Sequence, residues 1–231
     1  MNSYQINLFK GHAIIIDGEN SILIDTGAQS TIHITNNIVF CGESYHCAVN
    51  YGGLTVEKIS EMLGTQITTL LGIDILSNYK ILFDYRNNFV EFSKEEYKFN
   101  GEEVNIFSFM GIPIVELVVS EQNLKFFLDT GARLSYLSNT HTNRHRSVGI
   151  EEDFYPGIGG FETECFNIPT SLGSKVFNVR YGNLPPLLQA TLMLGGTDGI
   201  IGFDFFNNFK IELDIKNRKL KFENETDKAT I

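Results

Sequence analysis

The sequence contains no long apolar run. Near the N-terminus, Ala13 to Ile16 is only four residues long and is followed by Asp17, whereas a membrane-spanning helix needs about 20 apolar residues. We therefore expect neither a secretory signal nor a transmembrane segment. Cysteine is also scarce, because the chain holds only Cys41, Cys47 and Cys165, which do not make a disulfide framework. Both features favour the reducing environment of the cytoplasm.

Basic residues are few as well. The chain has 18 Lys and Arg against 28 Asp and Glu, which gives a formal net charge of −10. A nucleic-acid-binding protein would be expected to carry a basic face, so we expect no nucleic-acid partner and no membrane partner. Hydrophobic residues make up 42% and charged residues 20%, which is a globular composition. The 231 residues suit one large domain or two lobes of about 100 residues each.

A tetrapeptide that occurs twice organises the chain. Asp-Thr-Gly-Ala stands at residues 25–28 and again at residues 129–132, each time directly after an apolar, strand-like run. Each copy is followed later by two apolar residues and a glycine, at residues 70–72 and 200–202. An apolar strand therefore delivers a carboxylate into a tight turn at two places in the chain.

The repeat extends beyond these motifs. Residues 71–81 align with residues 201–211, and Asp84 then aligns with Asp214. The two turns are 104 residues apart and the two glycines 130 residues apart, so the second half carries about 26 extra residues between them. Two repeats are too few for a solenoid. We interpret the chain as an internal duplication that forms two similar lobes about a pseudo-twofold axis, and the polar stretch near residue 100 divides it into lobes 1–100 and 101–231.

The remaining patterns are mostly those of strands. Short apolar runs separated by turn residues predict hairpins before each Asp-Thr-Gly-Ala turn and again over residues 80–92. Val56 to Leu63 has helical spacing, and Gly64 is a natural stop for that helix. A second short helix is expected over Ile75 to Tyr79. The fold class is therefore all-β, with a few short helices.

Paired carboxylates suggest hydrolytic chemistry. Two carboxylates held close together cannot both ionise, so one apparent pKa rises and the pair shares a proton. One oxygen can then act as a base toward water while the protonated partner hydrogen-bonds the substrate carbonyl. A single Asp-Thr-Gly is most simply an ordinary strand-to-turn signal, but two copies in the same setting argue against that interpretation.

The residues beside each aspartate fit the same interpretation. Thr26 and Thr130 can hydrogen-bond backbone across the lobe interface and hold the two turns rigid. Gly27 and Gly131 let backbone N–H groups approach the carboxylates without a Cβ clash. We therefore expect these four residues to support a catalytic pair made of Asp25 and Asp129.

The chain thus resembles a single-chain aspartic peptidase of the retropepsin and pepsin-like superfamily. The resemblance rests on the two Asp-Thr-Gly-Ala motifs and on the segments that follow them, and Ala28 and Ala132 are similar to the retroviral type. It implies two β-barrel-like lobes with a substrate cleft between them, a dyad of Asp25 and Asp129, and a hairpin flap over the cleft. It also implies an endopeptidase that is a monomer, needs no metal or cofactor, and acts on extended peptide or protein substrates.

A glycine-rich stretch in the second half is the candidate flap. A closing lid needs a flexible hairpin tip whose backbone can bond an extended peptide, although a plain hairpin turn remains the alternative. Only the second half carries such a stretch, whereas pepsins carry their flap on the first lobe. The residues expected in the flap and in substrate binding are Tyr155, Gly157, Ile158, Gly159, Gly160 and Phe161.

Other signals are weaker. His141 and His145 are four residues apart, but no carboxylate lies between them, so a solvated loop is favoured over a metal site. Cys41 and Cys47 lack a second ligand pair for zinc. The rival function is a non-catalytic module that binds a peptide or a protein on a peptidase-like fold, and an enzyme with one dedicated protein target is a third possibility. Because an alanine follows each glycine, no hydroxyl stabilises the charged carboxylate there, and activity is expected at a milder pH than in a stomach-type enzyme.

Overall fold

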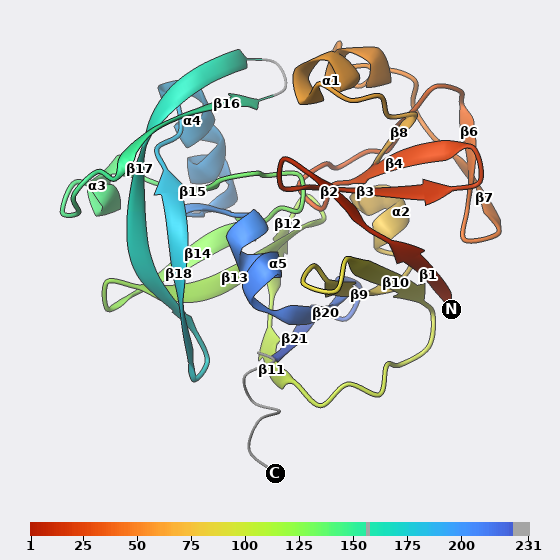
Figure 1. Ribbon diagram of the computed structural model, residues 1–231. Coiled ribbons are helices and arrows are strands. Elements are labelled where there is room, and N and C mark those ends of the chain that lie inside the picture. Colours follow the sequence, from red (N-terminus) through yellow and green to blue (C-terminus); the bar gives the residue numbers. More distant parts are fainter. Residues whose placement is uncertain (156–157, 224–231) are drawn as a thin grey trace.

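The computed structural model describes residues 1–155 and 158–223. The first hundred residues form ten strands and two helices (Figure 1). The strands are β1 (Asn2–Gln5), β2 (Asn7–Phe9), β3 (His12–Asp17), β4 (Asn20–Ile24), β5 (Ile32–His33), β6 (Asn37–Phe40), β7 (Glu43–His46), β8 (Thr69–Leu71), β9 (Lys80–Asp84) and β10 (Phe89–Ser93). The helices are α1 (Val56–Leu63) and α2 (Ile73–Leu76).

The described residues after position 100 form eleven further strands and three helices. The strands are β11 (Glu102–Asn105), β12 (Phe107–Phe109), β13 (Ile112–Val119), β14 (Gln122–Leu128), β15 (Ser135–Leu137), β16 (Gly149–Tyr155), β17 (Gly159–Leu172), β18 (Lys175–Gly182), β19 (Gly199–Ile201), β20 (Lys210–Asp214) and β21 (Lys219–Glu223). The helices are α3 (Asn139–Thr142), α4 (Pro186–Gly195) and α5 (Phe203–Asn208). The chain is therefore mostly β-structure, as predicted.

The two halves repeat one strand order. The first lobe is built on a five-stranded sheet in the order β2-β3-β4-β8-β5, and the second on an eight-stranded sheet that begins β12-β13-β14-β19-β15. In each lobe the strand that precedes an Asp-Thr-Gly-Ala turn pairs in parallel with the strand that ends in the two apolar residues before the anchoring glycine. The second sheet then continues through β18, β17 and β16, which lie in the interval where the second half is longer.

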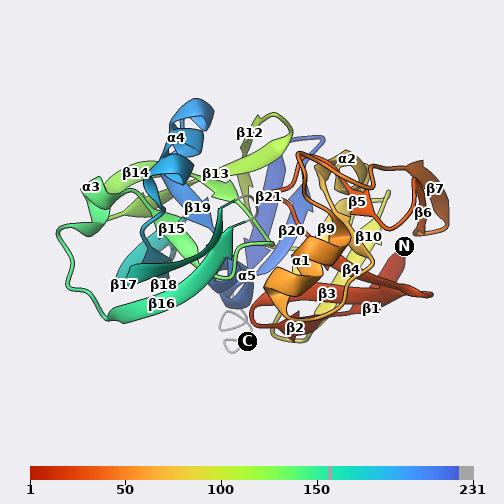
Figure 2. The same ribbon diagram turned by 90° about the horizontal axis from the view of Figure 1, so that it is seen from above.

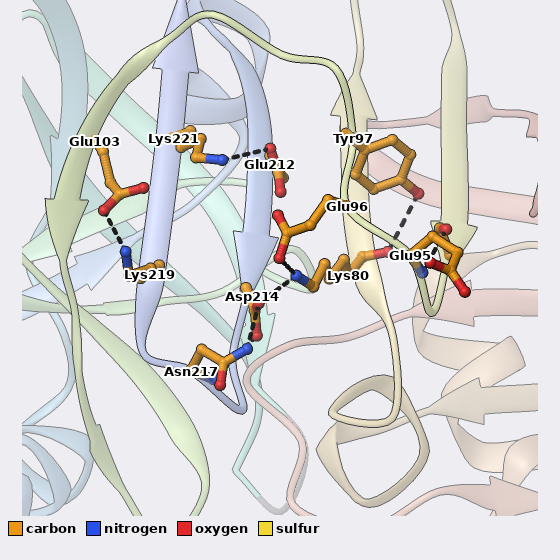
Figure 3. A network of polar contacts seen from close by, with 11 residues as sticks. Lys80, Glu95, Glu96, Tyr97, Glu103, Glu212, Asp214, Asn217, Lys219 and Lys221 are labelled. Carbon is orange, nitrogen blue, oxygen red and sulfur yellow. Dashed lines mark hydrogen bonds and ion pairs between the residues drawn. The ribbon is translucent and has the colours of Figure 1, made fainter.

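A third sheet joins the lobes. Its order is β1-β10-β9-β20-β21-β11, so three strands from each half meet at the antiparallel pair β9–β20. This sheet lies below both lobes in Figure 1, and Figure 2 shows β9 and β20 between them. Two symmetric ion pairs cross the junction: Lys80 Nζ lies 3.3 Å from Asp214 Oδ2 (Figure 3), and Lys210 Nζ lies 3.8 Å from Asp84 Oδ2.

The largest hydrophobic core runs through both halves. Phe83 of β9 and Tyr85, directly after it, are fully buried and pack against Phe206 of α5, with ring centroids 5.1 Å and 5.4 Å apart. Burying a large apolar side chain contributes about 1.5 to 3 kcal/mol. These aromatic contacts therefore bind the lobes together beneath the turns that carry Asp25 and Asp129.

The helices agree with the sequence only in part. Helix α1 has the predicted bounds: Val56, Ile59 and Leu63 are buried, and Gly64 ends the helix in a left-handed conformation with φ of 80°. Helix α2 spans Ile73–Leu76 rather than residues 75–79, because the turn starts directly after the anchoring glycine. Helices α3 and α4 were not predicted, and α3 includes His141, which was expected in a loop. No helix in residues 1–155 or 158–223 is long and apolar enough to cross a membrane, and all three cysteines are free.

Candidate active site

Each aspartate stands at the end of a central strand. The Asp25 N–H donates to the Leu71 carbonyl oxygen at 3.0 Å, and the Asp129 N–H donates to the Ile201 carbonyl oxygen at the same distance. These bonds continue the parallel pairs β4–β8 and β14–β19 for one more residue. The backbone of each carboxylate is thereby fixed to a buried strand, so both side chains start from rigid positions.

Thr26 and Thr130 link the two turns through four hydrogen bonds. Each backbone N–H donates to the other residue's Oγ1 at 3.0 Å. The Thr26 hydroxyl donates to the Leu128 carbonyl at 2.7 Å, and the Thr130 hydroxyl donates to the Ile24 carbonyl at 2.8 Å. Both side chains are buried, so losing either partner would leave unsatisfied polar groups that cost about 1 to 3 kcal/mol each. The predicted hydrogen bonds across the lobe interface are present.

The glycines of the turns bring the two carboxylates together. The Gly27 N–H donates to Asp25 Oδ1 at 2.9 Å, and the Gly131 N–H donates to Asp129 Oδ1 at 2.8 Å. A Cβ built on Gly27 would lie 2.5 Å from Asp129 Cγ, and one on Gly131 would lie 2.6 Å from Asp25 Cγ. Each glycine therefore leaves the space that the opposite carboxylate fills, which a larger residue would take away.

The two carboxyl groups act on each other electrostatically. Their side chains share a hydrogen bond. Burial, followed by the negative charge of Asp129, raises the pKa of Asp25 well above its ordinary value. Burial also raises the pKa of Asp129, while hydrogen bonds from the turn and from Asp25 oppose that rise. The arrangement therefore favours a pair of carboxyl groups that holds one proton between them.

The segments after β8 and β19 pass directly behind the turns. A Cβ on Gly72 would lie 2.9 Å from the Ala28 carbonyl oxygen, and one on Gly202 would lie 2.3 Å from that of Ala132. Their N–H groups donate to the hydroxyls of Thr31 and Ser135, respectively, at 3.0 Å and 3.1 Å.

We did not predict these two hydroxyl roles. Thr31 and Ser135 each stand six residues after an aspartate of the doubled turn. A residue-by-residue alignment of the two halves could therefore have found them.

The hairpin β16–β17 holds the remaining predicted site residues. Tyr155 and Gly159 are paired across it, and Gly160 and Phe161 follow on β17. Gly157 lies outside the described residues. Tyr155, Ile158 and Phe161 pack against the second lobe's own apolar cluster. Burial and then the charges of Asp129 and Asp25 raise the pKa of Tyr155 to about 12, so its hydroxyl lies within electrostatic reach of both carboxylates.

The hairpin also touches the first lobe. Phe154 packs against the apolar cluster that includes Ile59 and Leu63 of α1. The imidazole ring of His12 lies 5.9 Å, centroid to centroid, from the ring of Phe154. One hairpin therefore contacts both lobes, with Phe154 on one side and Tyr155 on the other.

His12 and Tyr85 are site residues that the sequence analysis missed. His12 is 4% exposed, and burial lowers its pKa. Tyr85 is 2% exposed, and burial followed by the charges of Asp129 and Asp25 raises its pKa. Neither lies in a recognisable motif, because both reach the site only through the packing of the lobes.

The described residues offer no evident metal site. Among residues 1–155 and 158–223, no three His, Cys, Asp or Glu side chains are grouped so that they could hold a metal ion. His141 Nε2 lies 3.9 Å from Asp198 Oδ1, whereas His145 Nε2 is hydrogen-bonded to Ser120 Oγ at 3.0 Å. The two histidines therefore have different partners.

Solved structures resemble this chain. The aspartic proteinase from Irpex lacteus matches 96% of this chain and 97% of its own, with a TM-score of 0.53 and 12% sequence identity. At that identity the likeness shows the fold alone. The chain has the two-lobed fold of the pepsin-like aspartic proteases. No protein-family model matches the sequence, and none of the curated proteins matches it.

Two shorter likenesses cover only part of the chain. A retropepsin-like aspartic protease from Rickettsia conorii matches 55% of this chain and 96% of its own, with 18% identity and a TM-score of 0.38. The EIAV protease in complex with the inhibitor HBY-793 matches 41% of this chain and 84% of its own, with 22% identity and a TM-score of 0.32. We draw nothing further from these two.

Proposed function

We propose that this chain is an aspartic endopeptidase whose catalytic dyad is Asp25 and Asp129. The observation that carries the proposal is the pair of carboxyl groups itself. They come from equivalent turns of the two lobes, share a hydrogen bond, and have pKa values raised by burial. Two carboxylates that share one proton can supply both the base and the acid that amide hydrolysis needs.

In the proposed reaction the pair holds one proton, which is written here on Asp25. Asp129 accepts a proton from a water molecule as the water oxygen attacks the carbonyl carbon of the scissile amide. Protonated Asp25 hydrogen-bonds the carbonyl oxygen and stabilises the charge that develops on it. Asp129 then passes that proton to the amide nitrogen, the C–N bond breaks, and the products are a carboxylic acid and an amine. No covalent intermediate with the chain forms.

The hairpin β16–β17 is the flap in this proposal. An extended peptide would lie between the hairpin and the two aspartates and pair with backbone groups of the hairpin, as added strands do. Tyr155, Ile158 and Phe161 would line apolar subsites beneath it, and Gly159 and Gly160 would leave its backbone open. The binding role of Gly157 stays a prediction.

We further propose how the whole protein is organised. The lobes span 1–100 and 101–231 and arose by internal duplication, which their repeated strand order supports. The dyad is complete within one chain, so a monomer suffices. Three free cysteines, two of them buried, fit a reducing compartment such as the cytoplasm.

The test is cleavage of a broad peptide library from about pH 4 to pH 7.5 by the wild type and by the variants Asp25→Asn and Asp129→Asn. General acid–base catalysis supplies about 10²- to 10⁴-fold, so each variant should lose at least about 10²-fold in kcat/KM. Asp17→Asn, at the far end of β3, is the matched control and should keep full activity.

Cleavage that survives in both dyad variants would overturn the mechanism. If the folded wild type cleaves nothing while Asp129→Asn still binds peptides, the rival function of a binding module would replace the peptidase.

A further inference from the structure

We propose that this chain selects substrates with a basic side chain, lysine or arginine, through a cavity between the hairpin β16–β17 and the first lobe. The inference rests on the proposed peptidase function and names the substrate class of that same site. The cavity has a volume of about 840 Å³, which is within the range of ligand pockets. Neither Asp25 nor Asp129 lines it, but Arg133 and Leu134, a few residues beyond Asp129, do. It therefore lies beside the dyad, where a neighbouring side chain of a bound peptide would enter.

The basic residues of the cavity are already engaged. Lys10 Nζ donates to the Leu63 carbonyl at the end of α1, at 3.4 Å, a position where the helix dipole favours a cation. Arg133 Nη1 lies 2.9 Å from Glu151 Oε2. Arg180 Nη2 lies 3.0 Å from Glu151 Oε1. Carboxylates remain in excess, because five Asp and Glu side chains line the cavity against three Lys and Arg side chains.

Two glutamates carry that uncompensated charge. Glu152 on β16 and Glu162 on β17 are directly opposite each other in the antiparallel hairpin, and both line the cavity. Both are exposed, and no described residue makes an ion pair or hydrogen bond with either side chain. Like charges directly opposite each other destabilise a strand pair. A cation between the two carboxylates would remove that cost.

The opposite wall is suited to the stem of a long basic side chain. Glu152 lies on the same face of the hairpin as Phe154, because alternate residues of a strand share a face, and Phe154 packs toward the first lobe. Met62 and Leu63 of α1 line the cavity from that lobe. Lysine and arginine bury their methylene stems along apolar surface and keep the charged end in polar surroundings.

His12 adds an independent sign that the cavity takes a hydrogen-bond donor. It lines the cavity, is 96% buried, and its Nδ1 has no hydrogen-bond partner among the described residues. Burial lowers its pKa, while the negative charge of Asp153 opposes that effect. A neutral imidazole has one donor and one acceptor nitrogen. In the tautomer that carries its proton on Nε2, Nδ1 is an acceptor that an ammonium or guanidinium N–H could satisfy.

The experiment compares peptides that differ at one position. Fluorescence-quenched peptides carry lysine, the uncharged isostere norleucine, or glutamate at each position around the cleaved bond. At one position, the wild type should prefer lysine to norleucine about five- to tenfold in kcat/KM, and added salt should reduce that preference. The double variant Glu152→Gln/Glu162→Gln should bring the ratio of the two kcat/KM values to about one.

Glu164→Gln is the matched control. Glu164 is exposed on the same face of β17, opposite Ile150, and does not line the cavity. This variant should keep the wild-type preference. A wild type without preference for lysine at any position, or a double variant that keeps its preference, would overturn the inference while the peptidase function stands.

A binding measurement separates failure of the inference from failure of the function. Fluorescence anisotropy with the Asp129→Asn variant gives the dissociation constants of the lysine and norleucine peptides without cleavage. If no peptide is cleaved by the wild type, the proposed function fails, and the ratio of these constants still decides the basic subsite. Equal affinities for the two peptides would overturn it.

Discussion

Replacing Asp25 by asparagine should make the folded chain more stable at neutral pH. In the native state burial and the neighbouring Asp129 raise the pKa of Asp25, whereas in the unfolded chain the carboxyl group has its ordinary pKa. Between these two pKa values the folded state holds a proton that the unfolded state has released. Stability contributed by such a group is fully present below the unfolded pKa and is lost as the pH rises through the folded pKa. Asparagine carries no charge and removes that loss.

The size of the effect follows from the number of protons. One extra proton in the native state gives a slope of about 1.4 kcal/mol per pH unit in the free energy of unfolding. The stability of Asp25→Asn relative to wild type should therefore rise with pH at up to that slope above the ordinary pKa of an aspartate. It should level off once the dyad of the wild type has lost its proton.

Asp214→Asn is a control with the opposite sign. Burial would raise the pKa of Asp214, but hydrogen bonds from Asn217 and the ion pair with Lys80 outweigh it and lower the pKa. Its stabilisation is present above the unfolded pKa and is lost as the pH falls through the folded pKa. Hydrogen bonds to a charged group are worth about 1.5 to 3 kcal/mol, so this variant should be about 2 kcal/mol less stable at neutral pH.

Urea unfolding of the three proteins, at intervals between pH 3 and pH 7.5, provides the measurement. Taking each variant relative to wild type removes the contribution of the carboxylates they share. A difference between Asp25→Asn and wild type that stays flat with pH would refute the shared proton. A loss of stability at neutral pH that grows with pH would refute it as well.

Two further changes test the packing around the dyad. The buried hydroxyl of Tyr85 has no hydrogen-bond partner among the described residues, whereas that of Tyr181 is bonded to Thr170 at 2.9 Å. Tyr85→Phe should therefore keep or raise the free energy of unfolding in thermal or urea melts. Tyr181→Phe should lower that free energy by about 1 kcal/mol. Equal losses of stability in the two variants would contradict this. Gly27→Ala would put a Cβ 2.5 Å from Asp129 Cγ and would push that carboxyl group away. Displacing a catalytic group by about 1 Å can cost about 100-fold in rate, so kcat/KM should fall at least that far. An unchanged kcat/KM would show that the turn tolerates a side chain.

The local features of the fold could be predicted from the sequence because local chemistry decides them. The apolar runs before the two Asp-Thr-Gly-Ala turns form β4 and β14. Gly64 ends α1, because the residue after the helix adopts a left-handed conformation that glycine tolerates. The repeat also implied that the two turns would face each other. The hydrogen bonds of Thr26 and Thr130 follow from that symmetry, because each threonine hydrogen-bonds the backbone of the other lobe in the same way.

Features that depend on tertiary packing could not be predicted. The repeat aligns Lys80 with Lys210 and Asp84 with Asp214, and each lysine forms an ion pair with the aspartate of the other half. These ion pairs form only because β9 and β20 lie side by side. Helix α4 was missed because its apolar residues do not keep to one face, and Leu187, Met193 and Leu194 are exposed. His12, at the start of β3, and Tyr85, directly after β9, reach the site only because the two lobes pack against each other.

The pH dependence of kcat/KM on the best peptide from the library tests the dyad most directly. Because burial raises the pKa of both carboxyl groups, the active form, with one proton on the pair, should persist toward neutral pH. We expect a bell-shaped profile, one limb for each ionisation of the pair, with its maximum above the strongly acidic range. A profile that peaks in strong acid, or one that rises without a second limb up to pH 7.5, would contradict a pair of carboxyl groups that share one proton.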